Sequence, residues 1–147
     1  MRTLLTCLLL AAVSCANREP RPVEIESTDM CAQCKMAISE KRYAAELVDA
    51  EGNVTKFDNL DCMVRYASSR GLRDKSATWF VMDSEGREWL DARKVLLVRA
   101  ASIPGPMGSG ILAVKDAAAA GLLAKRFSGQ VLYFDDLWAG EGEHHER

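Results

Sequence analysis

Short apolar segments alternate with turn sequences along the middle of the chain, and their length and spacing predict small strands. Two acidic turn sequences, DAEG at residues 49–52 and DSEG at 83–86, lie between or directly after such segments. Six segments are predicted as strands: residues 43–48, 54–57, 78–82, 95–99, 110–114 and 130–134.

Apolar residues recur at helical spacing in two longer segments. The first, residues 59–69, has Asp58 or Asn59 as its N-cap and Gly71 as its stop. The second is residues 115–127. Their apolar faces are predicted to hold Leu60, Met63, Tyr66 and Ala67, and Leu122, Leu123 and Phe127, respectively. Each half therefore has the order strand, strand, helix, strand. This order predicts an α+β fold of two similar ββαβ lobes that form one compact domain.

The two ends of the chain differ from this folded middle. Residues 1–14 combine Arg2 with a leucine-rich stretch, which is typical of a secretory signal peptide and too short to span a bilayer. The sequence AVSC that ends at Cys15 resembles a bacterial lipobox, so Cys15 is expected to carry lipid. Polar residues 15–28 predict a flexible linker, 29–138 the folded domain and 139–147 a disordered tail. The expected location is extracytoplasmic, on a membrane, and the outer membrane if the cell is Gram-negative. Ordinary secretion with an incidental Cys15 is the alternative.

The composition excludes several classes of function. The 147 residues have a formal net charge of −2, so nucleic acid is not an expected partner. Both histidines, His144 and His145, lie in the expected tail. The domain therefore lacks the imidazole needed for a serine-type triad, a histidine-ligated zinc hydrolase or c-type haem attachment.

Sulfur is concentrated near the start of the domain, where Cys31, Cys34 and Met36 lie within a seven-residue segment that begins at Met30. Thiolates and thioethers are soft ligands that suit Cu(I). Structural zinc normally needs four ligands from two such pairs, and no second CxxC exists here. Metal binding and redox chemistry of the Cys31/Cys34 pair both remain open on this motif.

Two other sulfur-containing residues, Met107 and Cys62, have two interpretations each. Met107 lies between Pro and Gly on a tight loop, where it is either a thioether ligand or a cap on the core. Cys62, at the start of the first predicted helix, is either a core residue or a ligand whose pKa the helix N-terminus lowers. Met30 is predicted to plug the core at the domain entrance, and Met63 and Met82 are predicted to lie within the core.

Several motifs occur in one order, and together they resemble the NosL family, the accessory lipoproteins of nitrous oxide reductase. After the lipobox and the CxxCxM segment come KFDNLDCM at 56–63, WLDA at 89–92, GPMG at 105–108 and YFDDL at 133–137. The resemblance implies a monomeric, extracytoplasmic Cu(I)-binding protein of two ββαβ lobes. Its partner would be nitrous oxide reductase or another extracytoplasmic copper protein, and it would not be an enzyme.

The resemblance also implies ligands, because Cys34, Met36 and Met107 match the family's sulfur-bearing positions. Cys31 and Cys62 look like features of a subgroup and are expected to assist. The family often has Cys-Gly-Met where this chain has Cys34-Lys35-Met36. Two other hypotheses remain: a thiol–disulfide oxidoreductase that uses Cys31 and Cys34, and a partner-binding lipoprotein in which these cysteines form a stapling disulfide.

Overall fold

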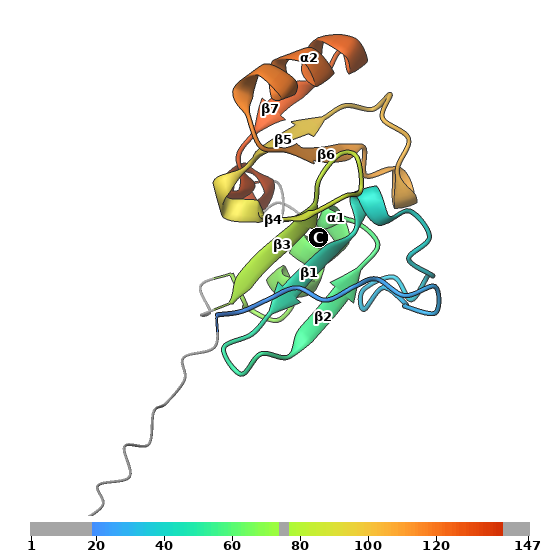
Figure 1. Ribbon diagram of the computed structural model, residues 1–147, viewed down its shortest axis with the longest axis vertical. Coiled ribbons are helices and arrows are strands. Elements are labelled where there is room, and N and C mark those ends of the chain that lie inside the picture. The colour runs from blue at the N-terminus through green and yellow to red at the C-terminus, as the bar shows by residue number, and fades with distance from the viewer. Residues whose placement is uncertain (1–18, 74–76, 140–147) are drawn as a thin grey trace, which may run out of the picture.

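The structure is a computed structural model that describes residues 19–73 and 77–139. It has two lobes, with the first in the lower half of Figure 1 and the second, with its helix, at the top. The first lobe contains β1 (Ala45–Val48), β2 (Val54–Phe57), α1 (Leu60–Ser68), β3 (Thr78–Met82) and β4 (Trp89–Asp91). The second contains β5 (Leu96–Arg99), β6 (Ile111–Val114), α2 (Ala117–Phe127) and β7 (Gln130–Leu132).

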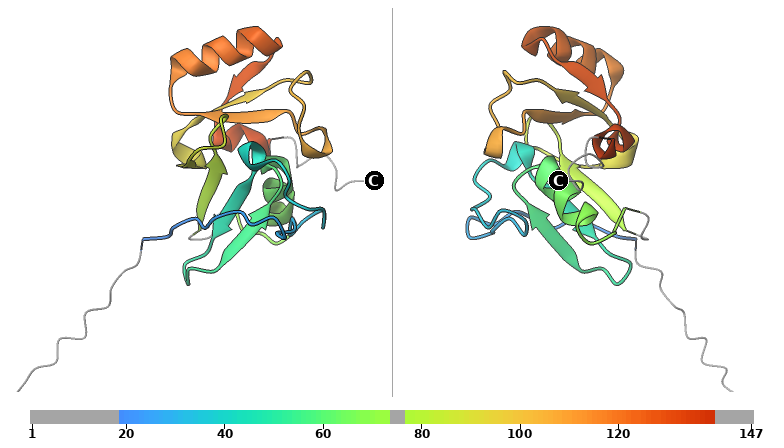
Figure 2. Two further views of the ribbon diagram at one scale, coloured as in Figure 1. Left: turned by 45° about the vertical axis from the view of Figure 1, so that its right-hand side comes forward. Right: turned by 180° about the vertical axis from the view of Figure 1, so that it is seen from behind.

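The two sheets repeat one strand order. The first sheet has the order β2-β1-β3-β4 and the second β6-β5-β7, and all of these neighbours pair antiparallel. In each lobe, the first strand of the chain order therefore lies between the second and the third. The predicted α+β fold of two ββαβ lobes is confirmed. In Figure 2, the view from behind shows α1 against the first sheet, with α2 over the second.

The first sheet has one strand more than the sequence predicts. β4 pairs with β3 through a hairpin whose turn is the acidic sequence at 83–86, and Gly86 there has a φ of 72°. The Asp83 carboxylate accepts hydrogen bonds from the backbone N–H groups of Arg87 and Glu88. Only Leu90 of this three-residue strand is buried, so its hydrophobic pattern is too short to predict a strand.

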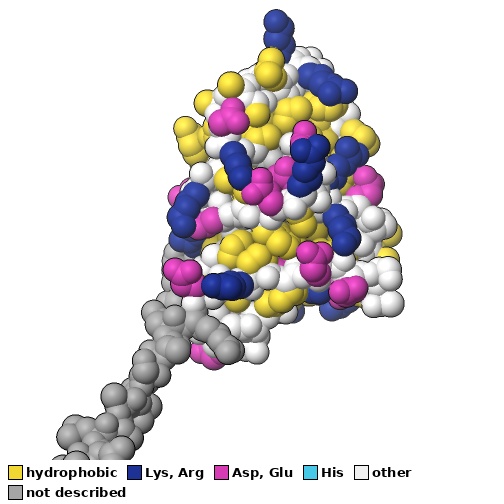
Figure 3. All heavy atoms as spheres, in the orientation of Figure 1, with side chains coloured by type: hydrophobic (Ala, Val, Ile, Leu, Met, Phe, Trp, Pro, Cys, Tyr) yellow, Lys and Arg dark blue, Asp and Glu magenta, His cyan; other side chains and the backbone are white. Residues whose placement is uncertain are grey.

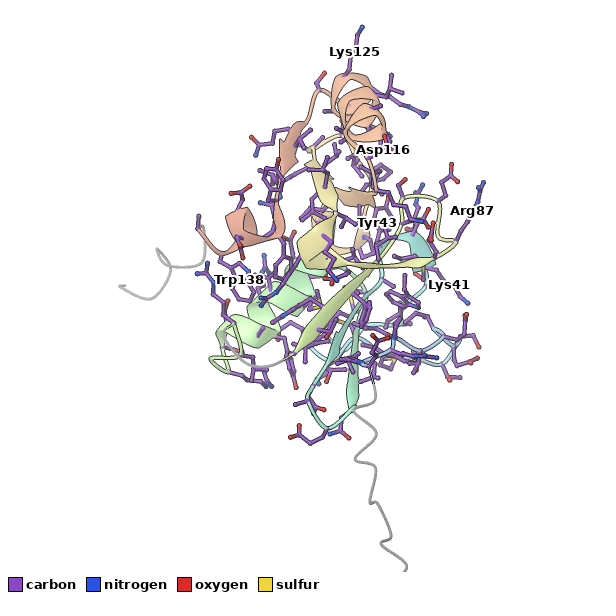
Figure 4. The ribbon with its side chains drawn as sticks, turned by 60° about the vertical axis from the view of Figure 1, so that its left-hand side comes forward. Lys41, Tyr43, Arg87, Asp116, Lys125 and Trp138 are labelled. Atoms are coloured by element: carbon purple, nitrogen blue, oxygen red, sulfur yellow. The ribbon has the colours of Figure 1, made fainter. Side chains whose placement is uncertain are left out.

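Both lobes contribute to one core. Trp79 of β3 packs against Phe134 and Trp138, with ring centroids 5.4 and 5.6 Å away. These two rings belong to the short 3-10 turn that follows β7, so the end of the second lobe returns to the first. Figure 4 shows Trp138 and Tyr43 at the level where the lobes meet. The shared core explains why neither ββαβ unit needs a large interior of its own.

One residue of a predicted face is assigned wrongly, whereas Leu123 and Phe127 of that face do pack against the core. Leu122 was assigned to the apolar face of α2, yet its side chain is 71% exposed. The packed stripe runs through the buried Ala120 and the partly buried Leu123, Ala124 and Phe127, which are spaced i, i+3, i+4 and i+7. Leu122 falls outside this stripe because the small alanines, rather than the leucine, lie closest to the sheet.

The folded part of the chain begins within the segment expected to be a linker. Ile25 is buried, and the backbone N–H of Val23 donates to the Glu46 carboxylate at 2.9 Å. The indole N–H of Trp89 donates to the Val23 carbonyl at 3.1 Å. This segment crosses the first sheet (Figure 1). Two apolar residues, Val23 and Ile25, among polar neighbours are too few to give a periodic signal, so the sequence does not predict this packing.

The surface is mixed in charge. On the face drawn in Figure 3, Lys and Arg side chains alternate with Asp and Glu across both lobes. Among the described residues, neither helix has the length and apolar character required to cross a membrane. The predicted signal, the expected lipid at Cys15 and both histidines lie outside the described residues.

Candidate metal centre

Three cysteines and one carboxylate meet beside the first sheet. The sulfurs of Cys31, Cys34 and Cys62 and a carboxylate oxygen of Asp58 all lie within 4.8 Å of one another. The three cysteines are free thiols. Metal–sulfur bonds are about 2.3 Å long, as in zinc sites, so ligands around one ion lie roughly 4 Å apart. These four side chains can therefore converge on one metal ion with little movement. We call them the thiol cluster.

A tight loop places two of the cysteines. The backbone N–H of Cys31 donates to the Met36 carbonyl at 2.8 Å, and the Lys35 N–H donates to the Cys31 carbonyl at 3.0 Å. The Ala32 N–H donates to the Lys56 carbonyl at 2.9 Å, which fixes the loop against β2. The loop thus holds Cys31 and Cys34 over the strand that leads to Asp58.

Lys35 takes the backbone conformation that glycine adopts most easily. Its φ is 65°, in the left-handed region, and its ammonium group donates to the Ala32 carbonyl at 2.7 Å. A residue with a Cβ is strained there by roughly 1–2 kcal/mol. The departure from Cys-Gly-Met therefore leaves the turn intact, and the ammonium group binds the loop itself.

The start of α1 supplies the third cysteine. Asn59 is the N-cap, and its side-chain oxygen accepts the Cys62 N–H at 2.8 Å. Cys62 is 4% exposed and faces the loop that carries Cys31. Of the two caps that the sequence allows, the structure therefore selects Asn59, and Asp58 is left for another role.

The thiol cluster concentrates negative charge on Cys31. The Cys62 thiol donates a hydrogen bond to the Cys31 sulfur, and together with nearby backbone N–H groups it lowers the pKa of Cys31 to about 6. The same hydrogen bond, together with burial, raises the pKa of Cys62. The expectation that the helix N-terminus would lower the pKa of Cys62 is therefore wrong, because the neighbouring Cys31 thiolate outweighs it. Burial also raises the pKa of Cys34.

Asp58 is the site residue that sequence reasoning missed. It is 2% exposed, and its Oδ2 accepts the Cys34 thiol at 3.4 Å. Its Oδ1 is buried and has no hydrogen-bond partner in the described structure. An aspartate directly before a capped helix suggests a second capping group in sequence, so nothing there signals its burial beside three thiols.

The methionines lie in a different environment from the cysteines. Met36 is 56% exposed and Met107 is 63% exposed. Met30 is 55% exposed, so the prediction that it plugs the core is wrong. It pairs with Ala37 in an isolated bridge, which turns its side chain outward. Met63 and Met82 are buried, as predicted. Exposed thioethers can meet a partner's ligands, whereas a core methionine cannot.

The loop that carries Met107 is tied to the first lobe by two side chains. The Asn59 amide donates to the Pro106 carbonyl at 3.0 Å, and the Tyr43 hydroxyl donates to the Pro104 carbonyl. Asn59 therefore joins two parts of the candidate site, since its other end caps the helix at Cys62. Met107 itself has a φ of 57° and points away from the core. The interpretation of Met107 as a cap on the core is wrong.

Two comparisons with known proteins found sequences or structures similar to this chain. A sequence profile of the NosL family matches residues 22–140. Among solved structures, the crystal structure of the copper chaperone NosL from Shewanella denitrificans is similar, with a TM-score of 0.72 and 20% sequence identity. That match covers 81% of this chain and 96% of the other. No curated protein matches the sequence significantly. At this identity the structural likeness supports the two-lobed fold.

Proposed function

Because the chain belongs to the NosL family, we propose that it binds Cu(I) outside the cytoplasm and delivers it for assembly of the copper centres of nitrous oxide reductase. The observation that carries this proposal is the thiol cluster, in which three free cysteines lie within 4.8 Å of one another. Thiolates prefer Cu(I) to harder cations. The similar Shewanella protein, which is a copper chaperone, supports the same assignment. Another extracytoplasmic copper protein is the alternative recipient.

The proposed ligands are Cys34, Met36 and Met107, with Cys31 or Cys62 assisting. Cys34 is half-buried and the two methionines are more than half exposed, so an acceptor's ligand can reach copper that these three residues hold. Delivery requires such access, because a fully enclosed ion is released slowly. One cysteine thiolate among these ligands is enough to balance the single positive charge of Cu(I).

The proposed mechanism is ligand exchange. Copper enters as Cu(I) and leaves as Cu(I), so no electron is transferred and no covalent bond of a substrate is broken. Each thiol that becomes a ligand gives its proton to solvent on loading and takes one back on release. The protein in this role is a monomeric carrier and not an enzyme.

We also propose that Cys15 carries a lipid anchor. Val23, whose N–H is bound by Glu46, lies eight residues after Cys15. Eight extended residues span at most about 30 Å. A lipid on Cys15 would therefore keep the copper site close to the membrane surface, where extracytoplasmic acceptors could reach it.

A delivery experiment tests this function. The copper-loaded protein is mixed anaerobically with copper-free nitrous oxide reductase, and recovery of reductase activity is measured. Cys34→Ser is expected to abolish delivery, because Cys34 is a proposed copper ligand and the most accessible thiol of the thiol cluster. Ser69→Ala, at the far end of α1, is the matched control and is expected to deliver like the parent. The proposal fails if the loaded parent restores no more activity than the same amount of Cu(I) held by a small chelator.

The structure disfavours the oxidoreductase alternative. A thiol–disulfide enzyme needs an accessible cysteine with a lowered pKa. Here the cysteine with a lowered pKa, Cys31, is fully buried, and the pKa of the more accessible Cys34 is raised. Reduction of a disulfide-bonded model protein by dithiol, with and without this chain, would detect such activity, and we expect none.

A further inference from the structure

The sulfur atoms of the candidate site divide into two sets by burial. Cys31 is 0% exposed and Cys62 is 4% exposed, whereas Met36 and Met107 are 56% and 63% exposed. The exposure of Cys34, which is half-buried, is intermediate between those of the two sets. A single set of ligands at one depth would not show this division.

The buried set is already arranged for a metal ion. The sulfurs of Cys31, Cys34 and Cys62 lie within 4.8 Å of one another, which is close to the spacing of ligands around one ion. The loop hydrogen bonds fix Cys31, and the Asn59 cap fixes the helix turn that carries Cys62. Because these side chains are ordered before binding, little conformational entropy is lost when they take up an ion.

Asp58 provides an independent sign of a ligand at this depth. Its Oδ1 is buried without a partner, although buried polar atoms in native proteins are nearly always hydrogen-bonded. Its Oδ2 already accepts the Cys34 thiol. Because this carboxylate lies among three sulfurs, a cation bound there would supply the missing partner.

We infer that Cys31 and Cys62, together with Cys34, form an inner Cu(I) position that retains the ion without any methionine. Met36 and Met107 then form an outer position with Cys34, through which copper passes to an acceptor. This inference rests on the proposed function. It adds that the inner set of ligands holds the copper and that the outer set releases it. Cys34 belongs to both positions, so the ion can move between them without leaving the protein.

The inference is tested by measuring the equilibrium affinity for Cu(I) and the rate of its release separately. Affinity is measured by anaerobic competition with a chromophoric Cu(I) chelator, and release by the rate at which excess chelator removes bound copper. Cys7 and Cys15 are first replaced by Ser, so that only the three described thiols remain. This protein serves as the parent for all variants.

The double variant Met36→Leu/Met107→Leu is expected to keep the parent's affinity within about threefold while releasing copper about tenfold more slowly. Cys31→Ser and Cys62→Ser are each expected to weaken affinity by roughly a hundredfold or more, because each removes a thiolate ligand. Both methionines are exposed, so the double variant keeps its fold and gives a decisive result by itself. The fold of each serine variant is checked by circular dichroism.

Two results would overturn the inner position. One is a loss of affinity in the methionine variant as large as that in Cys34→Ser. The other is parental affinity in folded Cys31→Ser and Cys62→Ser. In either case delivery to nitrous oxide reductase could still succeed, so the proposed function would stand. If delivery fails while the serine variants lose affinity, the inner position stands and the proposed function is wrong.

Discussion

The two lobes have the same strand order and a helix capped in the same way, yet only the first contains a thiol cluster. In α1 the Asn59 side chain accepts the N–H of Cys62 at 2.8 Å, and in α2 the Asp116 side chain accepts the N–H of Ala119 at the same distance. The two caps thus place a thiol at one position and a methyl group at its counterpart. The local backbone is shared, and the difference in chemistry comes from one side chain and what packs against it.

The central strands differ in a similar way. Glu46 is the second residue of β1 and Leu97 the second residue of β5, and both are fully buried. Leu97 packs in the core, whereas Glu46 binds the N–H of Val23 in the segment that covers the first sheet. The chain before β1 also supplies Cys31 and Cys34. The segment before β1 therefore distinguishes the first lobe from the second, because it covers the first sheet and brings two cysteines to it.

The largest expected effect comes from Glu46. Burial raises the pKa of Glu46 to about 7, from an ordinary value near 4.5. The folded protein then keeps a proton that the unfolded chain loses, so the free energy of unfolding falls as the pH rises from about 4.5 to about 7. Lys56 opposes this shift, and Asp29 and Glu24 reinforce it.

Glu46→Gln is expected to remove this pH dependence and to stabilise the protein by about 1–3 kcal/mol at pH 8. Urea denaturation at pH 5 and pH 8 measures the effect. Glu51→Gln, in an exposed turn, is the control and should leave the pH profile unchanged. Equal profiles for the parent and Glu46→Gln would contradict the assignment of this carboxylate.

Removing the two helix caps should have unequal effects. Asp116→Ala is expected to lower the free energy of unfolding by about 1 kcal/mol, the usual value of an N-cap. Asn59→Ala is expected to cost about 2 kcal/mol, because it also removes the hydrogen bond to the Pro106 carbonyl. Asn59→Ser keeps a capping oxygen and loses the amide donor to Pro106, so its stability should fall between the parent and Asn59→Ala. Equal losses in the two alanine variants, measured by urea denaturation, would show that Asn59 does not couple the lobes.

A smaller effect is expected at Lys35, which has a positive φ. Lys35→Gly relieves the left-handed strain but loses the bond to Ala32, and we expect a gain of at most about 1 kcal/mol. Gln33→Gly, in the same loop without a positive φ, is the control and should destabilise. A clear loss of stability in Lys35→Gly, by thermal unfolding, would mean that the ammonium group matters more than the backbone strain.

The smallest effect is expected from a thiol added to the second lobe. Ala119→Cys places a cysteine at the counterpart of Cys62, but no loop brings further thiols to it. Because one thiolate alone holds Cu(I) weakly, the number of tightly bound copper ions should not change. A gain of one tightly bound ion in an anaerobic titration would show that the capped helix start, rather than the thiol cluster, makes the site.

The sequence predicted the ββαβ repeat because each element has its own local pattern and turn. It also indicated that Cys31 and Cys34 lie close together, since their spacing is local. The burial of Asp58 and the packing of Val23 and Ile25 depend on contacts between distant segments, which no local pattern reveals. The exposure of Met107 likewise depends on the Asn59 and Tyr43 bonds that hold its loop.

Copper K-edge X-ray absorption of the loaded protein tests the central claim most directly. The measurement is made on the parent with Cys7 and Cys15 replaced, after addition of one equivalent of copper under reducing conditions. The account predicts an edge typical of Cu(I) and a first coordination shell made only of sulfur, because Cu(I) prefers the three thiols of the cluster to the harder carboxylate of Asp58. A first shell dominated by oxygen or nitrogen, or a Cu(II) edge, would contradict it.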